Sequence, residues 1–368
     1  MAGSGPGRTR RDMLRAMGIT AAAGLLASCG DDDDDGAVSG GTGSTTGGTG
    51  GGGGGGGGAH GNFPETPEWN FVFVNHVTTN PFFVPTQYGA EDASALLGTS
   101  FQWTGSETSD IPEMVDAFEA AIAGNADGIA VALVDLEAFN DPINQALEAG
   151  IPVVSYNADA DNARMAYVGQ DLYGSGFEMG NRIVEIVGEG KVGLFIATPG
   201  QLNIQPRIDG ALAAIEQSGA NIEATDIATG AELEEELSAI EAWYLGNTDA
   251  AGMFAVDAGS TQGVGQVVQQ QDARSGALKG AGGYDLLPTT VELVSSGVLD
   301  FTIDQQPYLQ GFLPVVYLYL SKLSGGVVLP PETNTGLVFL DSDSAKLFLD
   351  TSSRFEGDDE AQKIVEAG

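Results

Sequence analysis

The stretch from Ile129 to Ser155 decides the fold and reads IAVALVDLEAFNDPINQALEAGIPVVS. Its first five residues, 129–133, are all apolar, and such a run is typical of a strand buried on both faces of a parallel sheet. Residues 136–149 then predict a helix that Gly150 stops. Residues 151–155 begin a second apolar strand. The stretch therefore predicts one strand–helix–strand unit of a parallel α/β sheet.

The same alternation continues on both sides of this unit. Predicted strands cover 69–74, 100–103, 129–133, 151–155, 191–197, 222–227, 251–256, 280–284 and 299–303. Predicted helices cover 85–97, 111–123, 136–149, 174–187, 206–217, 232–245, 262–270, 288–296 and 306–323. Two successive series of strands and helices predict the α/β class, with two doubly wound, Rossmann-like lobes. A length of 368 residues fits two domains of ordinary size.

Residues 1–29 predict an export signal. An arginine-rich start precedes an apolar run over 16–27, which is too short to span a membrane. Arg10-Arg11 resembles a twin-arginine signal, and Leu26-Ala27-Ser28-Cys29 resembles a lipobox, in which the cysteine is acylated. The alternative is an ordinary signal with an incidental cysteine, but Cys29 is the one cysteine of the chain. We therefore expect an exported lipoprotein, in the periplasm or on the outer face of the cytoplasmic membrane.

Residues 30–67 predict a disordered tether. They contain five consecutive aspartates at 31–35 and an unbroken glycine run over 50–58. Such a composition cannot bury enough apolar surface to offset the entropy of ordering. As a glycine-rich coil, a segment of this length reaches about 30 Å. It would hold a folded domain near a membrane and leave it free to turn.

The charge balance excludes several classes of partner. The chain has 51 Asp and Glu against 14 Lys and Arg, a net charge of −37. Nucleic acid is excluded, because phosphate recognition needs clustered cations, and so is docking on an anionic membrane through a basic patch. A single cysteine excludes an intrachain disulfide framework and a zinc site built from several cysteines. The acidic excess also suggests adaptation to high salt, where screening relieves self-repulsion.

Ligands of open α/β sheets bind beyond the carboxyl ends of the strands, so the residues there are candidates for the site. They are 75–83, Asp135, 156–159, 198–207, Asp257, Asp285 and 304–306. The set mixes aromatic rings, carboxylates and amides with one arginine. Rings stack on the C–H faces of sugars, carboxylates accept from hydroxyls, and arginine or amide N–H groups donate to them. The set therefore favours a neutral, polyhydroxylated ligand.

Five short motifs carry a resemblance to a known family. They are Asn80-Pro81-Phe82-Phe83, AGIPVV at 149–154, YVGQD at 167–171, GYD at 283–285 and TIDQQP at 302–307. In this order and spacing, roughly over 68–340, the chain resembles the ribose-type periplasmic sugar-binding proteins, which are solute-binding components of bacterial sugar ABC transporters. The resemblance implies the type I periplasmic binding protein fold, in which a three-strand hinge joins two lobes.

The resemblance also implies how the chain is divided. An N-terminal lobe takes 68–172 plus 307–336, a C-terminal lobe takes 173–306, and 337–368 form a C-terminal segment with an acidic tail. The hinge crossovers fall near 171–174, 304–307 and 332–337. No function is assigned to the tail.

Site residues follow from the same resemblance. Asn80 and Gln305 would bond ligand hydroxyls, and Phe82 and Phe83 would stack on the ring. Arg207 would be a forked donor, Asp285 would accept from two hydroxyls, and Asp257 holds a place usually taken by Asn or Asp. Tyr156 and Asn157 stand where the family often has Asp-Arg. This departure leaves the ligand open among a pentose, a hexose, a polyol and a furanose-like signal such as autoinducer-2.

Each of these residues also has a reading without a ligand. Phe82 and Phe83 would then be core residues, Asp257 and Asp285 helix N-caps, and Arg207 a surface residue at a helix start. His76 lies near the predicted cleft and is read as incidental.

The function implied is the capture of a small sugar-like solute by hinge closure and its delivery to an ABC permease, by a monomer. A module that presents the ligand to a sensor is the alternative. A glycosidase with Asp257 and Asp285 as its paired carboxylates is a weaker alternative, because nothing marks either as a proton donor. The chain has no phosphate-binding loop, dinucleotide fingerprint or zinc-protease motif. We expect no enzyme activity, no cofactor and no metal.

Overall fold

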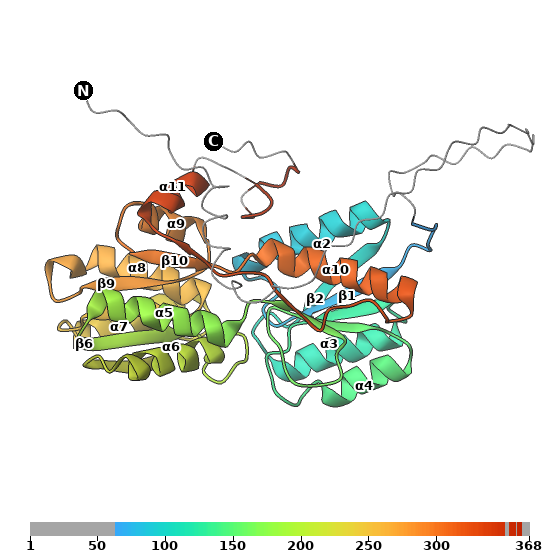
Figure 1. Ribbon diagram of the computed structural model, residues 1–368, viewed down its shortest axis with the longest axis horizontal. Helices are drawn as coiled ribbons and strands as arrows, with labels where there is room; N and C mark the ends of the chain where they lie inside the picture. The colour runs from blue at the N-terminus through green and yellow to red at the C-terminus, as the bar shows by residue number, and fades with distance from the viewer. Residues whose placement is uncertain (1–62, 350–352, 358, 363–368) are drawn as a thin grey trace, which may run out of the picture. The chain divides into compact units, whose positions relative to one another are not determined.

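The computed structural model describes residues 63–349, 353–357 and 359–362 (Figure 1). The predicted export signal, the lipidation site Cys29 and the tether up to residue 62 lie outside the described residues.

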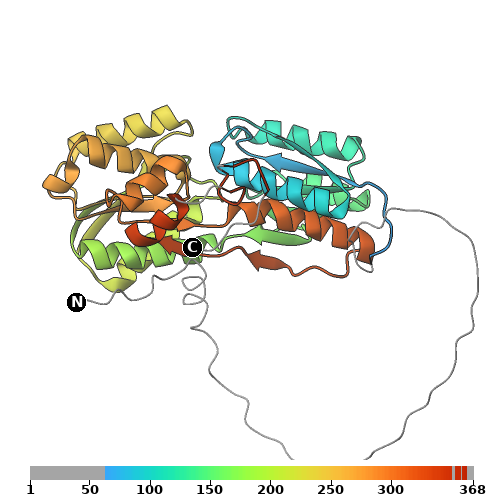
Figure 2. The same ribbon diagram turned by 90° about the horizontal axis from the view of Figure 1, so that it is seen from above.

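The first lobe is a six-stranded parallel sheet covered by helices on both faces. Its order is β11 (Glu332–Asn334), β5 (Ala166–Gly169), β4 (Val153–Tyr156), β3 (Gly128–Val131), β1 (Asn70–Asn75), β2 (Ser100–Gly105). Its helices are α2 (Val84–Leu97), α3 (Ile111–Ala123), α4 (Asn140–Glu148) and α10 (Pro307–Ser324). Helices α2 and α10 lie side by side on one face, and α3 and α4 cover the other (Figures 1 and 2).

The second lobe repeats this arrangement. Its sheet order is β12 (Val338–Leu340), β10 (Phe301–Asp304), β9 (Gly280–Tyr284), β8 (Gly252–Ala255), β6 (Gly190–Ile196), β7 (Ile222–Ala228), and only β12 is antiparallel to its neighbour. Its helices are α5 (Leu172–Val187), α6 (Gln205–Ser218), α7 (Leu233–Gly246), α8 (Ala258–Gln270), α9 (Pro288–Ser295) and α11 (Ser342–Leu349). Helices α5 and α6 share one core, and α7, α8, α9 and α11 share the other. Two doubly wound lobes were predicted, and the structure has them.

Strand β3 shows why the opening stretch decides the fold. Side chains alternate between the two faces of a strand. Ile129 and Val131 pack in the core beneath α3 and α4, whereas Ala130 and Ala132 pack in the core beneath α2 and α10. All four are fully buried, as a strand in the middle of a two-sided sheet requires.

The predicted helix over 136–149 begins later than expected, at Asn140. Pro142 lacks the amide hydrogen that a helix starting at residue 136 would need to bond the carbonyl of Ala138. Asp135 instead accepts bonds from the backbone N–H groups of Glu137 and Ala138, which forms a turn. The first helical bond then runs from Ile143 to Phe139.

The chain passes between the two lobes three times. It does so between β5 and α5, between β10 and α10, and between β11 and β12. The crossings span 170–171, 305–306 and 335–337, so the first begins one residue before the predicted 171–174 and the other two fall within their predicted ranges. β12 and α11, in the segment predicted to follow the lobes, join the second lobe through pairing with β10 and packing on α9.

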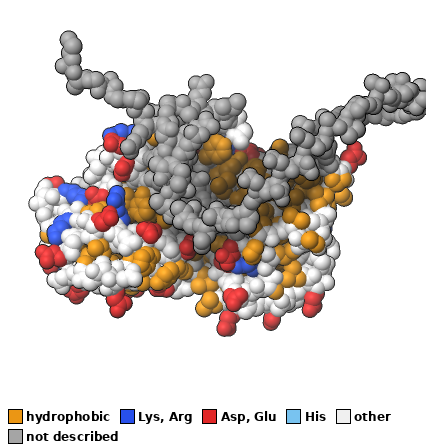
Figure 3. All heavy atoms as spheres, in the orientation of Figure 1, with side chains coloured by type: hydrophobic (Ala, Val, Ile, Leu, Met, Phe, Trp, Pro, Cys, Tyr) orange, Lys and Arg blue, Asp and Glu red, His pale blue; other side chains and the backbone are white. Residues whose placement is uncertain are grey.

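Acidic side chains lie over the surface of both lobes on the face shown in Figure 3, and basic side chains are few there. Within the described residues, no helix has both the length and the apolar character that crossing a membrane requires.

Candidate functional site

One pocket gathers residues that follow strands of both sheets. The first lobe contributes His76, Asn80, Phe82, Phe83 and Asn157, the second contributes Asn203, Ile204, Arg207, Asp257, Ala258 and Asp285, and the second crossing contributes Gln305. Strands β1 and β6 are the points at which strand order reverses in each sheet, where ligands of this architecture bind. Eight of the nine predicted ligand contacts line this pocket, and Tyr156 does not.

Tyr156 belongs to the core of the first lobe. It is fully buried, its ring lies 5.5 Å from that of Phe73, and its hydroxyl accepts a bond of 2.8 Å from Asn75 Nδ2. Tyr156 is the last residue of β4, so its side chain still lies on one face of the sheet. Asn157, the next residue, has a positive φ of 63° and lines the pocket. The predicted ligand contact of Tyr156 is therefore not made in this pocket.

The aromatic wall is set by a cap at the start of a short 3-10 helix, η1 (Pro81–Phe83). Asn80 Oδ1 accepts a bond of 2.9 Å from the backbone N–H of Phe82, which fixes the entry of the turn. The rings of Phe82 and Phe83 meet edge to face with centroids 4.7 Å apart. Both rings are also part of the core of α2 and α10, so each is a core residue and part of the pocket wall at once.

Arg207 is held rigidly in the second lobe. Only 2% of the residue is exposed, so it is not a surface residue. One terminal nitrogen donates to the carbonyl of Val256 (2.8 Å), the other to Gln170 Oε1 (3.1 Å), and the guanidinium lies 4.0 Å from the ring centre of Tyr284. The backbone of Arg207 lies so close to α5 that a Cβ at Gly176 would come within 2.2 Å of its carbonyl oxygen. A glycine is required there.

The two pocket aspartates have different environments. Asp257 caps α8: its carboxylate accepts from the N–H of Ser260 (2.8 Å) and of Ala197 (2.9 Å), so the N-cap reading is confirmed. Burial raises the pKa of Asp257. Burial, and then the nearby charge of Asp257, raise the pKa of Glu236 to about 9. Glu236 is therefore protonated at neutral pH beside Asp257.

Asp285 is not a cap, because α9 begins after Leu287. Its Oδ1 accepts a bond of 2.8 Å from Gln305 Nε2. Burial raises the pKa of Asp285 to about 7, although the charge of Arg207 and the bond from Gln305 act in the opposite direction. A group that donates a hydrogen bond to this carboxyl would favour its charged form and lower its pKa.

Buried glutamines connect the pocket to the three crossings. Gln310, fully buried in α10, accepts from Asn157 Nδ2 (3.1 Å) and donates to Gln305 Oε1 (3.1 Å) and Thr335 Oγ1 (3.3 Å). Gln170 accepts from Arg207 and donates to the carbonyl of Gly336 (3.0 Å). The predictions did not include either glutamine. Gln310 is the one amide in the apolar stretch 307–323, and that is the signal by which the sequence could have indicated it.

Four buried polar atoms of the pocket residues have no hydrogen-bond partner among the described residues: His76 Nδ1, Asn157 Oδ1, Asn203 Oδ1 and Arg207 Nε. An unpartnered buried polar atom costs about 1–3 kcal/mol, so folded proteins rarely retain one without a use for it. Asn157 and Asp285 also hold left-handed backbone conformations, with φ of 63° and 74°. Such strain gathers at functional sites. The pocket is therefore arranged to receive a polar ligand.

In the part of the chain that the structure describes, no group of three or more His, Cys, Asp or Glu side chains is placed to hold a metal ion.

Comparisons with known proteins agree with this architecture. Residues 71–324 match the model of the periplasmic binding protein domain. Over 319 residues the chain is 49% identical to the xylose/arabinose-binding protein of Sulfolobus acidocaldarius. The aligned part covers 83% of this chain and 78% of that protein.

Solved structures are similar over nearly their whole length. The glucose-galactose binding protein of Geobacillus stearothermophilus has a TM-score of 0.69 at 25% identity, covering 75% of this chain and 98% of its own. An ABC transporter solute-binding protein of Burkholderia graminis, in complex with D-arabinose, has a TM-score of 0.71 at 22% identity, covering 76% and 98%. The second likeness concerns the fold alone. With a family model over most of the chain and a relative at 49% identity, this chain belongs to the periplasmic binding protein family.

Proposed function

We propose that this protein is the solute-binding component of an ABC importer and captures a monosaccharide, of the pentose class, in the pocket between its lobes. The observation that carries the proposal is one pocket lined both by a pair of phenyl rings and by buried polar atoms that have no partner among the described residues. A sugar is the common metabolite that offers both an apolar face and a ring of hydroxyls. The name of the relative at 49% identity supports a pentose.

In this proposal the sugar ring has different partners on its two sides. The C–H face packs on Phe82 and Phe83, while Arg207 Nε donates to a ring or hydroxyl oxygen. The oxygen of Asp285 that Gln305 does not bond accepts from a hydroxyl. Micromolar binding needs about −8 kcal/mol, which several bonds to charged groups at about 1.5–3 kcal/mol each, plus stacking at about 1 kcal/mol, can supply.

Ligand binding and lobe closure are one event in this proposal. Contacts come from both lobes, so a ligand has a higher affinity for the closed arrangement and shifts the population toward it. Closure excludes water, which strengthens the bonds to Arg207 and Asp285. Domain closure around a ligand in periplasmic binding proteins is an established example of hinge motion.

The remaining expectations belong to the same proposal. The protein is exported, is anchored by lipid at Cys29, acts as a monomer and delivers its sugar to a membrane permease without chemical change. A Cys29→Ser variant then moves from the membrane fraction to the soluble fraction. A variant that stays in the membrane fraction contradicts the anchor.

Calorimetry and thermal shift in molar salt test the ligand class. The panel is D-xylose, L-arabinose, D-ribose, D-glucose, D-galactose and a pentitol. We expect at least one pentose to bind with a micromolar or lower dissociation constant and to raise the Tm by several degrees, because ligand bound only to the native state stabilises it. A folded sample that gives neither heat nor a shift with any sugar overturns the proposal.

A further inference from the structure

His76 and Asn203 meet across the two lobes inside the pocket. His76 directly follows β1 in the first lobe, is 5% exposed and lies edge-on to the ring of Phe83. Asn203 lies in the loop between β6 and α6 of the second lobe. Its Nδ2 is 3.2 Å from His76 Nε2.

The contact is one of three consecutive contacts from that loop to the first lobe. Gln201 Nε2 donates to Ser109 Oγ (2.7 Å), and the N–H of Leu202 donates to the carbonyl of Val134 (3.1 Å). Of the three loop residues, only Asn203 lines the pocket. The His76–Asn203 pair therefore lies where the lobes touch and where the ligand binds.

Each partner keeps one buried polar atom that has no bond among the described residues, His76 Nδ1 and Asn203 Oδ1. Burial lowers the pKa of His76 to about 4, so its ring is neutral at pH 7 and has one donor and one acceptor nitrogen. If Asn203 donates to Nε2, the pair presents a donor at Nδ1 and an acceptor at Oδ1. If the amide lies the other way round, the two roles exchange. Either way the pair offers one donor and one acceptor.

We propose that His76 and Asn203 form a two-lobe clamp on one hydroxyl of the ligand, with one side chain donating to that hydroxyl and the other accepting from it. A hydroxyl both donates and accepts, so it satisfies both orphan atoms at once. The clamp would reject a sugar that lacks this hydroxyl, because both buried atoms then stay unpaired. The inference rests on the proposed function and deepens it.

Calorimetry with the bound pentose and its monodeoxy analogues tests the clamp. We expect His76→Ala and Asn203→Ala each to weaken pentose binding about 10–100-fold. In the wild type, one deoxy analogue should lose affinity by a similar factor. In either variant that analogue and the parent sugar should bind alike, while the other analogues keep their wild-type ratios.

Gln201→Ala is the matched control, because it removes the neighbouring contact between the lobes but not a pocket residue. It should weaken all analogues by the same factor. His76→Phe keeps an aromatic ring but has neither donor nor acceptor, and replaces His76→Ala if the alanine variant does not fold. The clamp is wrong, and the proposed function is untouched, if the clamp variants bind the pentose as tightly as the wild type. The same holds if they keep the wild-type ratio of affinities between the pentose and every deoxy analogue. A wild type that binds no sugar overturns both proposals.

A second and independent observation concerns the C-terminal strap, residues 353–357. Helix α11 is fixed in the second lobe, where Ala345 and Phe348 are part of its core. The strap then lies on the first lobe. Arg354 pairs with Glu91 and Asp92 of α2, and its guanidinium lies 4.1 Å from the ring centre of Tyr88. The Arg354 side chain is 7% exposed and that of Asp92 is 17% exposed, so this pair is more buried than an ordinary surface ion pair, whereas Glu91 is 59% exposed.

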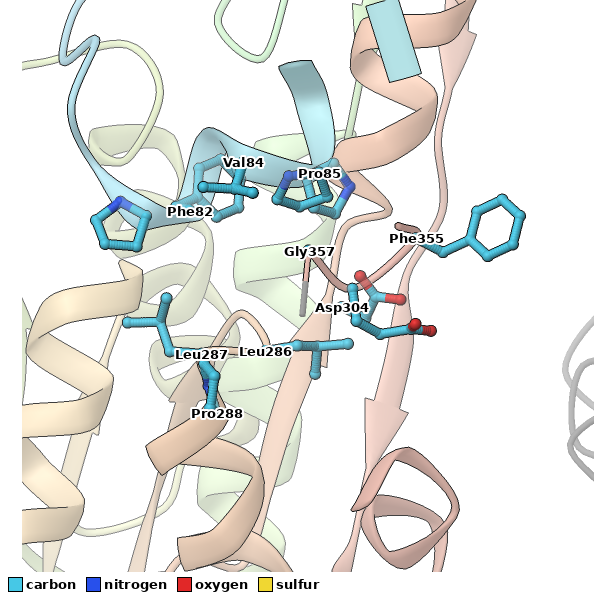
Figure 4. Close-up of a pocket in the computed structure, with 12 residues that line it drawn as sticks. Phe82, Val84, Pro85, Leu286, Leu287, Pro288, Asp304, Phe355 and Gly357 are labelled. Carbon is cyan, nitrogen blue, oxygen red and sulfur yellow. The ribbon is translucent and has the colours of Figure 1, made fainter. Parts of the chain in front are cut away.

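The strap also fills space beside the second crossing. Phe355 packs edge to face on Tyr308 of α10, with centroids 4.7 Å apart. Figure 4 shows Gly357 between Val84 and Pro85 on one side and Leu286 and Leu287 on the other, next to Asp304. The residues on the two sides come from different lobes. This pocket is separate from the sugar pocket and shares only Phe82 with it.

We infer that the C-terminal strap is a fourth connection between the lobes, and that it limits how far they open. Three residues separate Leu349 from Ser353, and a fully extended chain of that length spans at most about 14 Å. Opening beyond that reach must detach Arg354 from α2. A narrower open state raises the fraction of binding-competent molecules, and with it the apparent affinity.

X-ray scattering of the ligand-free and sugar-saturated protein tests the strap. Arg354→Ala should enlarge the radius of gyration without ligand, leave it unchanged with saturating ligand, and weaken binding about 3–10-fold. Arg182→Ala is the control, since Arg182 also pairs with an acid, Glu185, but its side chain is 42% exposed, against 7% for Arg354. If Arg354→Ala does not fold, Glu91→Gln with Asp92→Asn removes the same pairs. Variants with wild-type scattering and wild-type affinity overturn the inference.

Discussion

The two lobes have the same strand order but place different chemistry at their strand ends. The first lobe supplies rings and amides, namely Asn80, Phe82, Phe83, Asn157 and His76. The second supplies the charges, namely Arg207, Asp257 and Asp285. The repeated fold therefore fixes where a ligand binds. The side chains of the first lobe contribute the shape of the pocket, and those of the second contribute its charge.

The division has an energetic reason. Aromatic rings that belong to a core, like Phe83, keep their position whether or not a ligand is present. A buried charge needs fixed partners, and Gln170, Gln305 and the carbonyl of Val256 supply them in or next to the second lobe. Changes to the charged residues of the second lobe should therefore cost more affinity than changes to the phenyl rings of the first, and only the former should depend on pH.

The largest effect is expected for Arg207→Ala. It removes the pocket's arginine and leaves Asp285 buried without its nearby positive charge, so binding should fall more than about 100-fold. Arg207→Lys should rescue little, because one ammonium cannot replace the forked bonds to Val256 and Gln170. Calorimetry measures the affinity, and circular dichroism checks the fold. A folded Arg207→Ala variant with wild-type affinity would show that the charge of Arg207 does not contribute to ligand binding.

Asp285→Asn should come next, with a loss of about 10–100-fold at pH 8. In the wild type, hydroxyls that donate to Asp285 stabilise its charged form, so binding releases protons below about pH 7 and affinity rises from pH 5 to pH 8. The variant should lose this rise. Titrations in buffers of different ionisation enthalpy count the protons. A wild-type affinity that is flat over this range contradicts the assignment.

Asp285 also affects the stability of the fold, and this effect has the opposite pH dependence. The pKa of Asp285 is raised in the native state, so the ligand-free protein binds more protons than the unfolded chain between about pH 4 and pH 7. Its contribution to stability is therefore present at low pH and is lost as the pH rises to about 7.

Phe82→Leu tests the first lobe and should have a smaller effect, about 3–10-fold on affinity, because edge and stacking interactions of rings contribute about 0.5–1.5 kcal/mol. The loss should be the same at pH 5 and pH 8, which calorimetry at both values can establish. A loss that changes with pH would show that the lobes do not divide shape from charge as described.

Glu236→Gln should have the smallest effect on binding and a visible effect on stability. Glu236 is protonated at neutral pH, and its raised pKa makes wild-type stability fall as the pH rises from about 4.5 to about 9. Glutamine cannot ionise, so the variant should be more stable at pH 8 by on the order of 1 kcal/mol. Denaturant unfolding at pH 5 and pH 8 measures the difference. Equal pH slopes for both proteins would contradict a protonated Glu236.

Much of this molecule can be predicted from local pattern. The apolar run 129–133 predicts a buried strand, and the rule that ligands bind at strand ends leads directly to Arg207, Asp257 and Asp285. Tyr156 shows the limit of that rule, because the last residue of a strand still obeys the alternation of side chains, and here its side chain faces the core.

The features that could not be predicted depend on contacts between residues far apart in the chain. Gln310 becomes important only because Asn157, Gln305 and Thr335 converge on it. The sequence predicts His76 to be incidental, because its contact with Asn203 of the other lobe joins residues 127 positions apart in the chain. The strands β11 and β12 have three residues each, too few for a periodic signal, and they form through pairing with β5 and β10.

The left-handed backbone at Asn157, Asp285 and Gln306 has a consequence for engineering. Glycine adopts this conformation freely, so replacing any of the three with glycine relieves local strain of about 1 kcal/mol or more. At Asn157 and Asp285 it also deletes a side chain of the pocket. A laboratory selection for thermal stability alone would therefore favour variants that no longer bind the ligand. These positions should be kept constant in any library built to raise the stability of the protein.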